Sequence, residues 1–290
     1  MSFDIQNMLV AEVYDHPVDS IRLLETHISW VVLTGDYAYK IKKPVNFGFL
    51  DFSTLHKRKH YCEQEIVLNR RLSSNIYLAA VAISEQQGKL KLGDTHIVEY
   101  AVKMKQFAQA ALLDNMLAAG QLGRLHMDAL ARRIALFHEQ AQQADHTMQI
   151  GAADDVHEPI LENFRQIYEQ LDSERYDEHL NQLKKWCQTI FEQLKAVLNQ
   201  RKQDGFVREC HGDMHLANLI WMAGPEQESS AGVPMAFDCI EFNQQLRWID
   251  VISEIAFLVM DLQHRNQFEL AQRFLNTYLE VSGDYAGLSV

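Results

Sequence analysis

The stretch that decides the fold is His211-Gly212-Asp213-Met214-His215-Leu216-Ala217-Asn218, in the last third of a 290-residue chain. An apolar run, residues 219–222, follows directly. After a loop rich in Gly, Pro and Ser, residues 224–232, a second apolar run ends in Phe237-Asp238. Two apolar runs joined by such a loop predict a β-hairpin. That hairpin would bring Asn218 and Asp238 to one end of the strand pair.

Asp213, Asn218 and Asp238 carry the side chains that phosphoryl transfer to a hydroxyl requires. One carboxylate must accept the proton of the attacking hydroxyl, and oxygen ligands must hold Mg²⁺ against the phosphates. Asp213 suits the first task, and the other two suit the second. One alternative is a pair of loop-capping aspartates. Another is a metallohydrolase in which His211, Asp213 and His215 alternate as ligands on a strand, which leaves Asn218 and Asp238 without roles.

The pattern His-Gly-Asp-x-His-x-x-Asn, followed by Phe-Asp-x-x-Glu-Phe, resembles the aminoglycoside phosphotransferase and choline kinase superfamily. The spacing from His211 through Asp213 to Asn218 is similar to that of the kinase catalytic loop. The resemblance implies an α+β, two-lobed protein kinase-like fold, with a small antiparallel β-sheet lobe carrying one main helix and a larger, mostly helical lobe. It also implies ATP and Mg²⁺ as cofactors and a hydroxyl of a small molecule as the acceptor.

Residues 1–104 are predicted to form the nucleotide-binding lobe, and residues 105–290 the helical lobe with the catalytic loop and metal site. A five-stranded antiparallel sheet is expected in the first lobe, with Gly35-Asp36 as the turn of its first hairpin. Its predicted strands are 28–33, 37–42, 80–84, 89–92 and 95–104. A short helix is expected within residues 5–15 and a longer one through Leu72, capped by Ser53 or Thr54.

The second strand of the hairpin puts Ala38, Lys40 and Lys42 on one face. In the enzymes that the chain resembles, a strand lysine reaches the phosphates and a small residue two positions earlier leaves room for adenine. Lys40 fits that pattern, and Lys42 is the second choice. A helix glutamate pairs with the strand lysine in this fold, and we assign that role to Glu65, with Glu63 as the alternative. Without the downstream motif, solvated lysines and glutamates would be the ordinary interpretation.

No glycine-rich loop precedes this hairpin, and no Gly-x-x-x-x-Gly-Lys-Ser/Thr occurs, which excludes a P-loop kinase. Enzymes similar to aminoglycoside kinases often use a glycine-poor polar loop here, so Thr26 and Ser29 are candidates to bind phosphate. Met104 and Phe107 fall where a kinase has its interlobe hinge, whose backbone groups bond the adenine edge. We therefore predict that both residues contact the nucleotide.

Four further residues near the motif receive provisional roles. His211 is expected to brace the loop or act in the chemistry, and His215 to lie at the substrate mouth or stabilise the turn. Glu241 resembles the acidic position after the metal aspartate in choline kinase-like enzymes, and is expected to support the metal site or the substrate. By the same resemblance, Asp250 is expected to accept N–H bonds from the catalytic loop, with a helix N-cap as the alternative.

Composition narrows the class of protein. The formal net charge is −12, and basic residues cluster only at 40–43 and 56–60, so a nucleic-acid partner is not expected. The longest apolar run, 255–260, is too short to span a membrane, and residues 1–10 do not resemble a signal peptide. Four separated cysteines without Cys-x-x-Cys indicate reduced thiols and a cytoplasmic location.

Apolar stripes predict helices in the second half, one of them opened by Glu158-Pro159 because proline suits a first helical turn. The chain ends soon after Leu279, where related kinases usually carry further helices; a shortened C-terminus and a naturally short member are both open. The chief alternative to a kinase is a nucleotide-binding pseudokinase without turnover, which the missing glycine loop favours. The acceptor, the choice between ATP and GTP, and the oligomeric state are not determined by the sequence.

Overall fold

The computed structural model describes residues 3–145, 147–170, 177–222 and 232–290. They pack as two compact units, each built from two stretches of chain: Met1–Leu130 with Asp213–Asn243, and Ala131–Gly212 with Gln244–Val290. The division falls within helix α3 (Arg124–Gln140). The expected lobe boundary after Met104 stays a prediction. Most of the loop expected at 224–232 lies outside the described residues.

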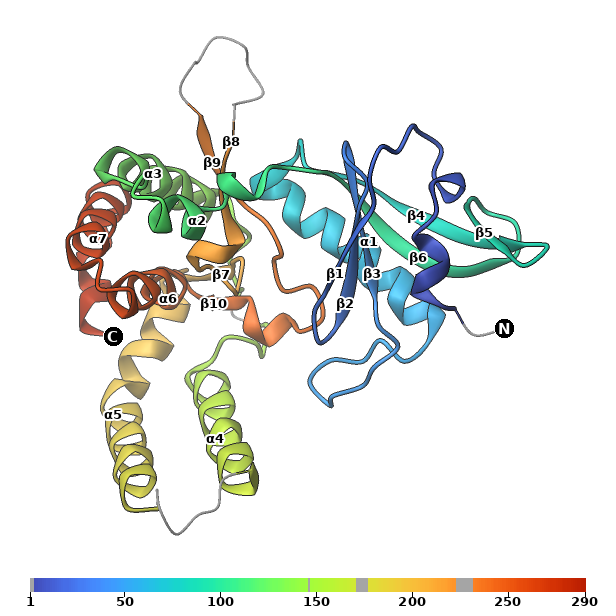
Figure 1. Cartoon of the computed structure of the whole chain (residues 1–290). Helices are drawn as coiled ribbons and strands as arrows, with labels where there is room; N and C mark the ends of the chain where they lie inside the picture. Colours follow the sequence, from blue (N-terminus) through green and yellow to red (C-terminus); the bar gives the residue numbers. More distant parts are fainter. Residues whose placement is uncertain (1–2, 146, 171–176, 223–231) are drawn as a thin grey trace. The chain divides into compact units, whose positions relative to one another are not determined.

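The first unit contains a six-stranded antiparallel sheet in the order β1-β2-β3-β6-β4-β5 (Figure 1). Its strands are β1 (Arg22–Glu25), β2 (Ser29–Leu33), β3 (Tyr37–Lys42), β4 (Tyr77–Gln86), β5 (Lys89–Leu92) and β6 (Ile97–Lys105). The expected antiparallel sheet is confirmed, but the predicted number of five strands is wrong. The additional strand, β1, has only four residues and no alternating pattern, and its pairing with β2 defines it.

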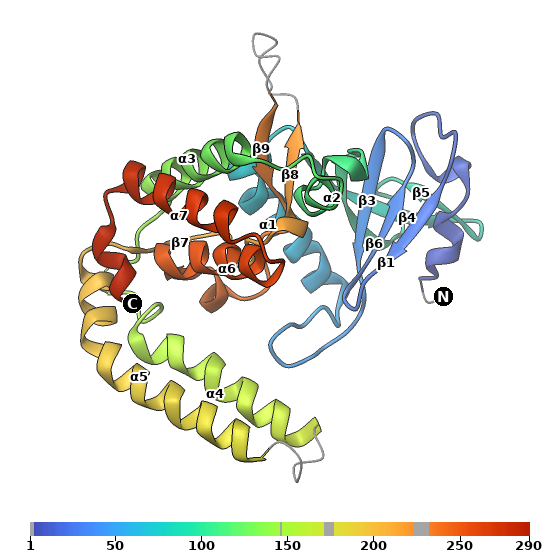
Figure 2. The ribbon, with the colours of Figure 1, turned by 60° about the vertical axis from the view of Figure 1, so that its left-hand side comes forward.

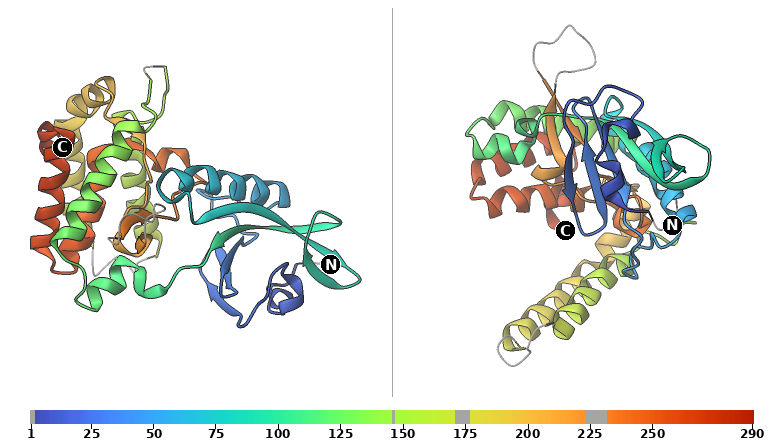
Figure 3. Two further views of the ribbon diagram at one scale, coloured as in Figure 1. Left: turned by 90° about the horizontal axis from the view of Figure 1, so that it is seen from above. Right: turned by 45° about the vertical axis from the view of Figure 1, so that its right-hand side comes forward.

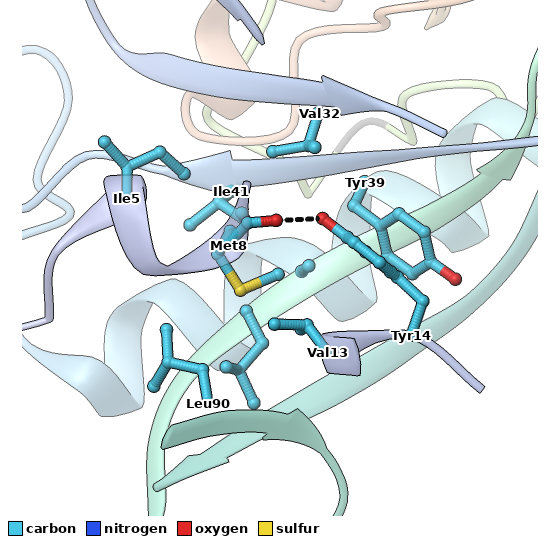
Figure 4. Close-up of a cluster of buried hydrophobic side chains, with 10 residues drawn as sticks. Ile5, Met8, Val13, Tyr14, Val32, Tyr39, Ile41 and Leu90 are labelled. Atoms are coloured by element: carbon cyan, nitrogen blue, oxygen red, sulfur yellow. Dashed lines mark hydrogen bonds between the residues drawn. The ribbon is translucent and has the colours of Figure 1, made fainter. Parts of the chain in front are cut away.

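One face of this sheet is covered by the N-terminal segment (Figure 4). Tyr39 and Ile41 of β3 pack there against Ile5 and Met8, and the hydroxyl of Tyr14 donates to the carbonyl oxygen of Met8 at 2.7 Å. The segment forms two 3₁₀ helices, η1 (Ile5–Met8) and η2 (Ala11–Val13), instead of the single short helix that was expected. The side chains of β3 thus alternate between faces as predicted.

The opposite face packs against helix α1 (Leu55–Ser73), which lies along the sheet in Figure 3. Ala38 of β3 belongs to this core together with Ile66 of α1. The helix begins as predicted, because the side chain of Thr54 accepts a hydrogen bond from the backbone N–H of Lys57 at 3.3 Å. The face of β3 that carries Ala38 and the two lysines therefore meets α1.

The predicted hairpin is present as β8 (Leu219–Met222) and β9 (Val233–Ala236). Leu219 pairs with Ala236, and one residue further the backbone N–H of Phe237 donates to the carbonyl oxygen of Asn218 at 3.0 Å. Asn218 and Asp238 are thereby brought to the same end of the hairpin. A short helix, α2 (Leu113–Ala118), contacts β8 within the same unit.

The second unit is mostly helical. Helices α4 and α5 pack side by side, as do α6 and α7 (Figure 2), and β7 pairs with β10 in a small antiparallel ladder. Their bounds are α4 (Ala153–Gln170), α5 (Asp177–Gln203), β7 (Val207–Glu209), β10 (Trp248–Asp250), α6 (Val251–His264) and α7 (Phe268–Ser282). Among the described residues, no helix has the length and apolar character to cross a membrane.

The predicted start of α4 at Glu158-Pro159 is wrong, because the helix already begins at Ala153. Asp154 and Asp155 occupy the first turn, where negative charge is favourable. The carboxylate of Asp155 also accepts a hydrogen bond from the backbone N–H of Ala152 at 2.9 Å. These acidic residues define the helix start, and the proline lies inside the helix.

Candidate active site

Lys40 lies at the centre of a charged cluster in the first unit. Its Nζ donates to Oε1 of Glu65 on α1 at 2.9 Å and to Oδ1 of Asp238. The residue is only 8% exposed. Burial alone would lower the pKa of Lys40, but the carboxylates of Asp238 and Glu65 raise it well above its ordinary value. The lysine is therefore protonated at neutral pH and joins β3 to α1 and to the segment after β9.

Lys42 is buried more deeply, with 1% exposure. Its Nζ donates to Oε2 of Glu65 at 2.6 Å and to Oε1 of Glu241, and lies 4.8 Å from the ring centroid of Phe52. Glu65 thus bridges both strand lysines, one with each carboxylate oxygen. The side chain of Glu63, the alternative glutamate, is half-exposed. Its Oε1 lies 3.6 Å from Nζ of Lys59 on the same helix.

Asp213 and Asn218, the residues predicted to form the catalytic loop, are joined directly. The side-chain Nδ2 of Asn218 donates to the backbone oxygen of Asp213 at 3.0 Å and to its Oδ2 at 2.9 Å. His215 Nε2 lies 3.5 Å from Asp213 Oδ1. The amide nitrogen of Asn218 is thus used as a donor, which directs its carbonyl oxygen to other groups.

The segment that carries Asp238 is held by α1 and by the start of β4. The backbone N–H of Asp238 donates to the hydroxyl of Tyr77 at 3.0 Å, and that of Cys239 donates to Oδ1 of Asn69 at 2.9 Å. Ser73 Oγ donates to the backbone oxygen of Ala236 at 2.6 Å. Asp238 itself has a left-handed φ of 63°, which is uncommon for a residue with a side chain. These contacts fix a backbone conformation that Asp238 would rarely adopt alone.

Sequence reasoning missed Asn69, Ser73 and Tyr77. With Glu65, the first two occupy one stripe of α1 at intervals of four residues, so they share a helix face. All three members of this stripe are buried polar residues. Their spacing was the available signal, since buried polar side chains require partners.

A cavity of about 210 Å³ lies within the first unit. Its lining includes Ser29, Lys40, Tyr77, Met104, Phe107 and Asp238. Ser29 is almost completely buried, and its hydroxyl is hydrogen-bonded to that of Thr26 at 2.9 Å. The cavity brings most of the predicted nucleotide contacts together. Lys42, Glu65 and Glu241 are not part of its lining.

In the second unit, Glu254 of α6 holds the start of the predicted catalytic loop. Its Oε1 accepts the backbone N–H groups of His211 at 2.6 Å and Gly212 at 2.7 Å. Its Oε2 lies 2.7 Å from Nε2 of His138, whose Nδ1 lies 2.8 Å from the hydroxyl of Tyr278. Burial would raise the pKa of Glu254, but the hydrogen bond and charge of His138 lower it below its ordinary value.

The expectation that Asp250 would accept these loop N–H bonds is wrong. Asp250 caps α6 by accepting the backbone N–H of Ile252 at 3.0 Å. It also forms a two-bond ion pair with Arg201, whose Nε lies 2.7 Å from Asp250 Oδ2. Both of its oxygens are used in this way, and Glu254, one helical turn later, accepts the loop N–H groups instead.

Gly212 is the one position of the motif that admits no side chain. Its φ is +89°, and a Cβ atom there would lie 2.6 Å from the carbonyl oxygen of Leu246. An alanine would therefore be strained by the backbone conformation and would also clash with a backbone atom.

Only one group of three His, Cys or acidic ligand atoms gathers within 4.8 Å in the part of the chain that the structure describes: His138, Cys210 and Glu254. Both ring nitrogens of His138 and both oxygens of Glu254 already have hydrogen-bond partners. This group therefore serves as a polar brace. It is also not the set of His211, Asp213 and His215 that the metallohydrolase alternative requires.

The fold and this arrangement of lysine, glutamate and catalytic loop define the protein kinase-like superfamily. The model of the ecdysteroid kinase-like family matches residues 65–281, three quarters of the chain, so the protein belongs to that family. The predicted superfamily is thus confirmed.

Two curated relatives are uncharacterised proteins, from Mycobacterium bovis and Mycobacterium tuberculosis. Each is 31% identical over 281 residues, which cover 96% of this chain and 52% of the relative. The chain spans about half the length of these relatives.

A solved structure with a similar fold is the GDP and kanamycin complex of APH(2")-IIia. The TM-score is 0.56 at 12% identity, over 99% of this chain and 86% of that one. At this identity the likeness concerns the fold alone, and it confirms the predicted α+β, kinase-like fold class.

Proposed function

We propose that the protein is an ATP- and Mg²⁺-dependent phosphotransferase that acts on a hydroxyl of a small molecule. The observation that carries the proposal is Lys40, which lines the cavity while pairing with Glu65 and Asp238. Lysine on a strand, paired with a helix glutamate, is how kinases direct an ammonium group at phosphate oxygens. The fold shared with a GDP- and kanamycin-bound protein supports a nucleotide and a small-molecule acceptor.

The residues around Asn218 and Asp238 suit Mg²⁺. The cation prefers oxygen ligands, and the two side chains offer an amide oxygen and a carboxylate at one end of the β8–β9 hairpin. Because the Nδ2 of Asn218 is committed to Asp213, its carbonyl oxygen is the atom left to act as a ligand. Held by these two residues, Mg²⁺ would supply positive charge that offsets the charge developing on the phosphates. Glu241 is less suited to this role, since its side chain is only 4% exposed and pairs with the enclosed Lys42, whereas the side chain of Asp238 is 45% exposed.

Asp213 has the role of orienting the acceptor hydroxyl and accepting its proton. The hydrogen bonds from Asn218 hold the carboxylate of Asp213 in a defined orientation. His215, at 3.5 Å from the other oxygen, would limit how far that carboxylate can rotate. His211 is buried, and its backbone is held by Glu254, which favours its bracing role over a chemical one.

The nucleotide would occupy the cavity in the first unit. Ala38 lines it two residues before Lys40, with Met104 and Phe107 also in the lining. Small and apolar side chains there suit a planar base, while Lys40 and Asp238 supply charge for the phosphates and the metal. The small-molecule hydroxyl acceptor and the cytoplasmic location stay predictions.

The experiment that tests the proposal combines binding and turnover. Thermal unfolding with ATP and Mg²⁺ should show a raised Tm, because a ligand that binds only the native state stabilises it. Without an acceptor, the protein should release phosphate from ATP slowly. Release should be faster with one member of a panel of hydroxyl compounds. Both effects should be lost in Asp238→Ala. A Tm shift without turnover under any condition would indicate the pseudokinase instead, and indifference to nucleotide would overturn both.

A further inference from the structure

Lys42 connects two elements that are remote in sequence. Its Nζ donates to Glu65 on α1 and to Glu241, three residues after Asp238. With 1% exposure and no part in the cavity lining, this ammonium group has no access to a nucleotide. Of the two strand lysines, only Lys40 lines the cavity, so a different task remains for Lys42.

The charges in the cluster explain why a second lysine is needed. Three carboxylates, those of Glu65, Asp238 and Glu241, are balanced by two ammonium groups. Glu65 and Glu241 are buried, and buried carboxylates are costly unless they are paired. If Lys42 were absent, Glu65 and Glu241 would have only Lys40 as a cation within the cluster. Glu241 would then lose its attachment to α1.

The position of Glu241 links this pairing to the metal. Asp238 and Glu241 belong to one short segment after β9, and α1 holds that segment at Cys239 through Asn69. The Lys42–Glu241 pair is a further attachment, two residues after Cys239. Together with the bond from the backbone N–H of Asp238 to Tyr77, these attachments define where the carboxylate of Asp238 is presented, including after Lys40 turns toward phosphate.

We propose that Lys42 is a positioning residue that holds the Asp238 segment against α1 through Glu241 and Glu65, and so sets the Mg²⁺-dependent part of nucleotide binding. The proposal rests on the proposed function, because it assigns Asp238 to the metal. It separates two roles on one strand: Lys40 contacts phosphate, and Lys42 keeps the metal ligand in place. Loss of Lys42 should therefore weaken the coupling between Mg²⁺ and nucleotide more than the binding of nucleotide alone.

The test is calorimetric titration with ADP, with and without Mg²⁺, on the full chain. The wild-type protein should bind ADP more tightly with Mg²⁺, since two ligands that favour the same state are coupled. In Lys42→Met the enhancement by Mg²⁺ should fall about tenfold, within the usual range of such couplings, while the Kd for Mg²⁺-free ADP stays within about threefold. Lys40→Met should instead weaken ADP binding without Mg²⁺. Lys91→Met, an exposed lysine on β5, is the matched control.

Two further variants keep the test decisive if Lys42→Met folds poorly. The double variant Lys42→Met with Glu241→Gln removes both charges of the Lys42–Glu241 pair at once. It should fold and still lose the enhancement of ADP binding by Mg²⁺. Lys42→Arg keeps the positive charge and should retain most of the enhancement of ADP binding by Mg²⁺. Circular dichroism reports whether each variant is folded.

The outcomes separate this inference from the proposed function. If wild-type protein binds ADP with Mg²⁺ enhancement and the folded double variant keeps that enhancement unchanged, Lys42 has only a structural role and the inference is overturned. If Lys42→Met and the double variant lose Mg²⁺-free ADP binding to the same extent as Lys40→Met, the division of roles between Lys40 and Lys42 is also overturned. If the wild-type protein binds no nucleotide, the proposed function and this inference fall together.

Discussion

The two units each bury a carboxylate that serves the catalytic motif, but they stabilise it differently. In the first unit, Glu65 is paired with two lysine ammonium groups, one of which lines the cavity. In the second unit, Glu254 is held by two backbone N–H groups and by His138. Under the proposed function, the lysines of the first arrangement would exchange partners when nucleotide and Mg²⁺ bind. The second contains no group that a substrate would displace, so it fixes backbone position.

This difference predicts that substitutions in the first unit act mainly on turnover, and those in the second mainly on stability. The four tests below examine that division, in order of decreasing expected effect.

The largest effect is expected for Asp213→Asn. Turnover should fall by about 10²–10⁴-fold, because the variant cannot accept the proton of the acceptor hydroxyl. The free energy of unfolding should change little, since asparagine keeps an oxygen that can accept the bond from Asn218. Phosphate release and thermal unfolding measure the two quantities. Asp94→Asn, in an exposed turn, is the control. Undiminished turnover in Asp213→Asn would contradict the prediction that substitutions in the first unit act mainly on turnover.

Glu254→Ala should act mainly on stability, the reverse of what is expected for Asp213→Asn. It leaves the backbone N–H groups of His211 and Gly212 and a buried histidine without their partner, which should cost about 3–5 kcal/mol of unfolding free energy. Urea denaturation measures this loss, and Glu280→Ala, an exposed glutamate on α7, is the matched control. Equal stability of the two variants would mean that the brace contributes nothing to folding.

The contribution of the charge on Glu254 should depend on pH. Its pKa is lowered in the folded state, so the carboxylate stabilises the protein above the unfolded pKa, near 4.5, and this contribution is lost as the pH falls through the folded pKa. Glu254→Gln keeps one acceptor oxygen without the charge. At pH 7 the unfolding free energy of the wild-type protein should exceed that of Glu254→Gln by about 1–2 kcal/mol. This is the difference expected between a charged and a neutral hydrogen-bond acceptor. Denaturation between pH 7 and 3 should show that gap closing in acid; a gap that widens in acid would contradict the assignment.

The smallest effect is expected for Tyr77→Phe, which removes the hydroxyl that accepts the backbone N–H of Asp238. The unfolding free energy should drop by about 1 kcal/mol, typical of one hydrogen bond. Because the bond holds the segment that carries Asp238, the proposed Mg²⁺ ligand, the Tm increase given by ATP with Mg²⁺ should also shrink. Tyr285→Phe, at a residue 60% exposed, is the control. If Tyr77→Phe matches that control in both measurements, the hydroxyl does not hold the segment.

The sequence was most informative where a local pattern determines geometry. The hairpin between Asn218 and Asp238 follows from two apolar runs and a turn-rich loop, and helix α1 follows from its cap and apolar stripe. The choice between Lys40 and Lys42 was not predictable from the sequence, because both lie on the same face of β3. Only the packing of α1 and of the segment carrying Glu241 distinguishes a lysine that lines the cavity from one that is enclosed.

The contacts of Glu254 with the loop and with His138 were missed for a different reason from the polar stripe of α1. Asp250 and Glu254 are both acidic and near the start of α6, so choosing the loop acceptor required knowing that Arg201 occupies the first of them. His138 lies far away in sequence, on α3, and nothing local to it indicates a partner on α6. Long-range polar pairs of this kind depend on tertiary packing, which a single sequence does not encode in a readable local pattern.

The close approach at Gly212 has a practical consequence for mutational surveys of this protein. A substitution there would abolish activity by displacing the backbone that leads into Asp213, although the glycine takes no part in the reaction. A screen that scores activity alone would therefore rank this position beside Asp213, the proposed proton acceptor. Asp213→Asn is the better starting point for trapping a bound acceptor, since it leaves the surrounding chain undisturbed.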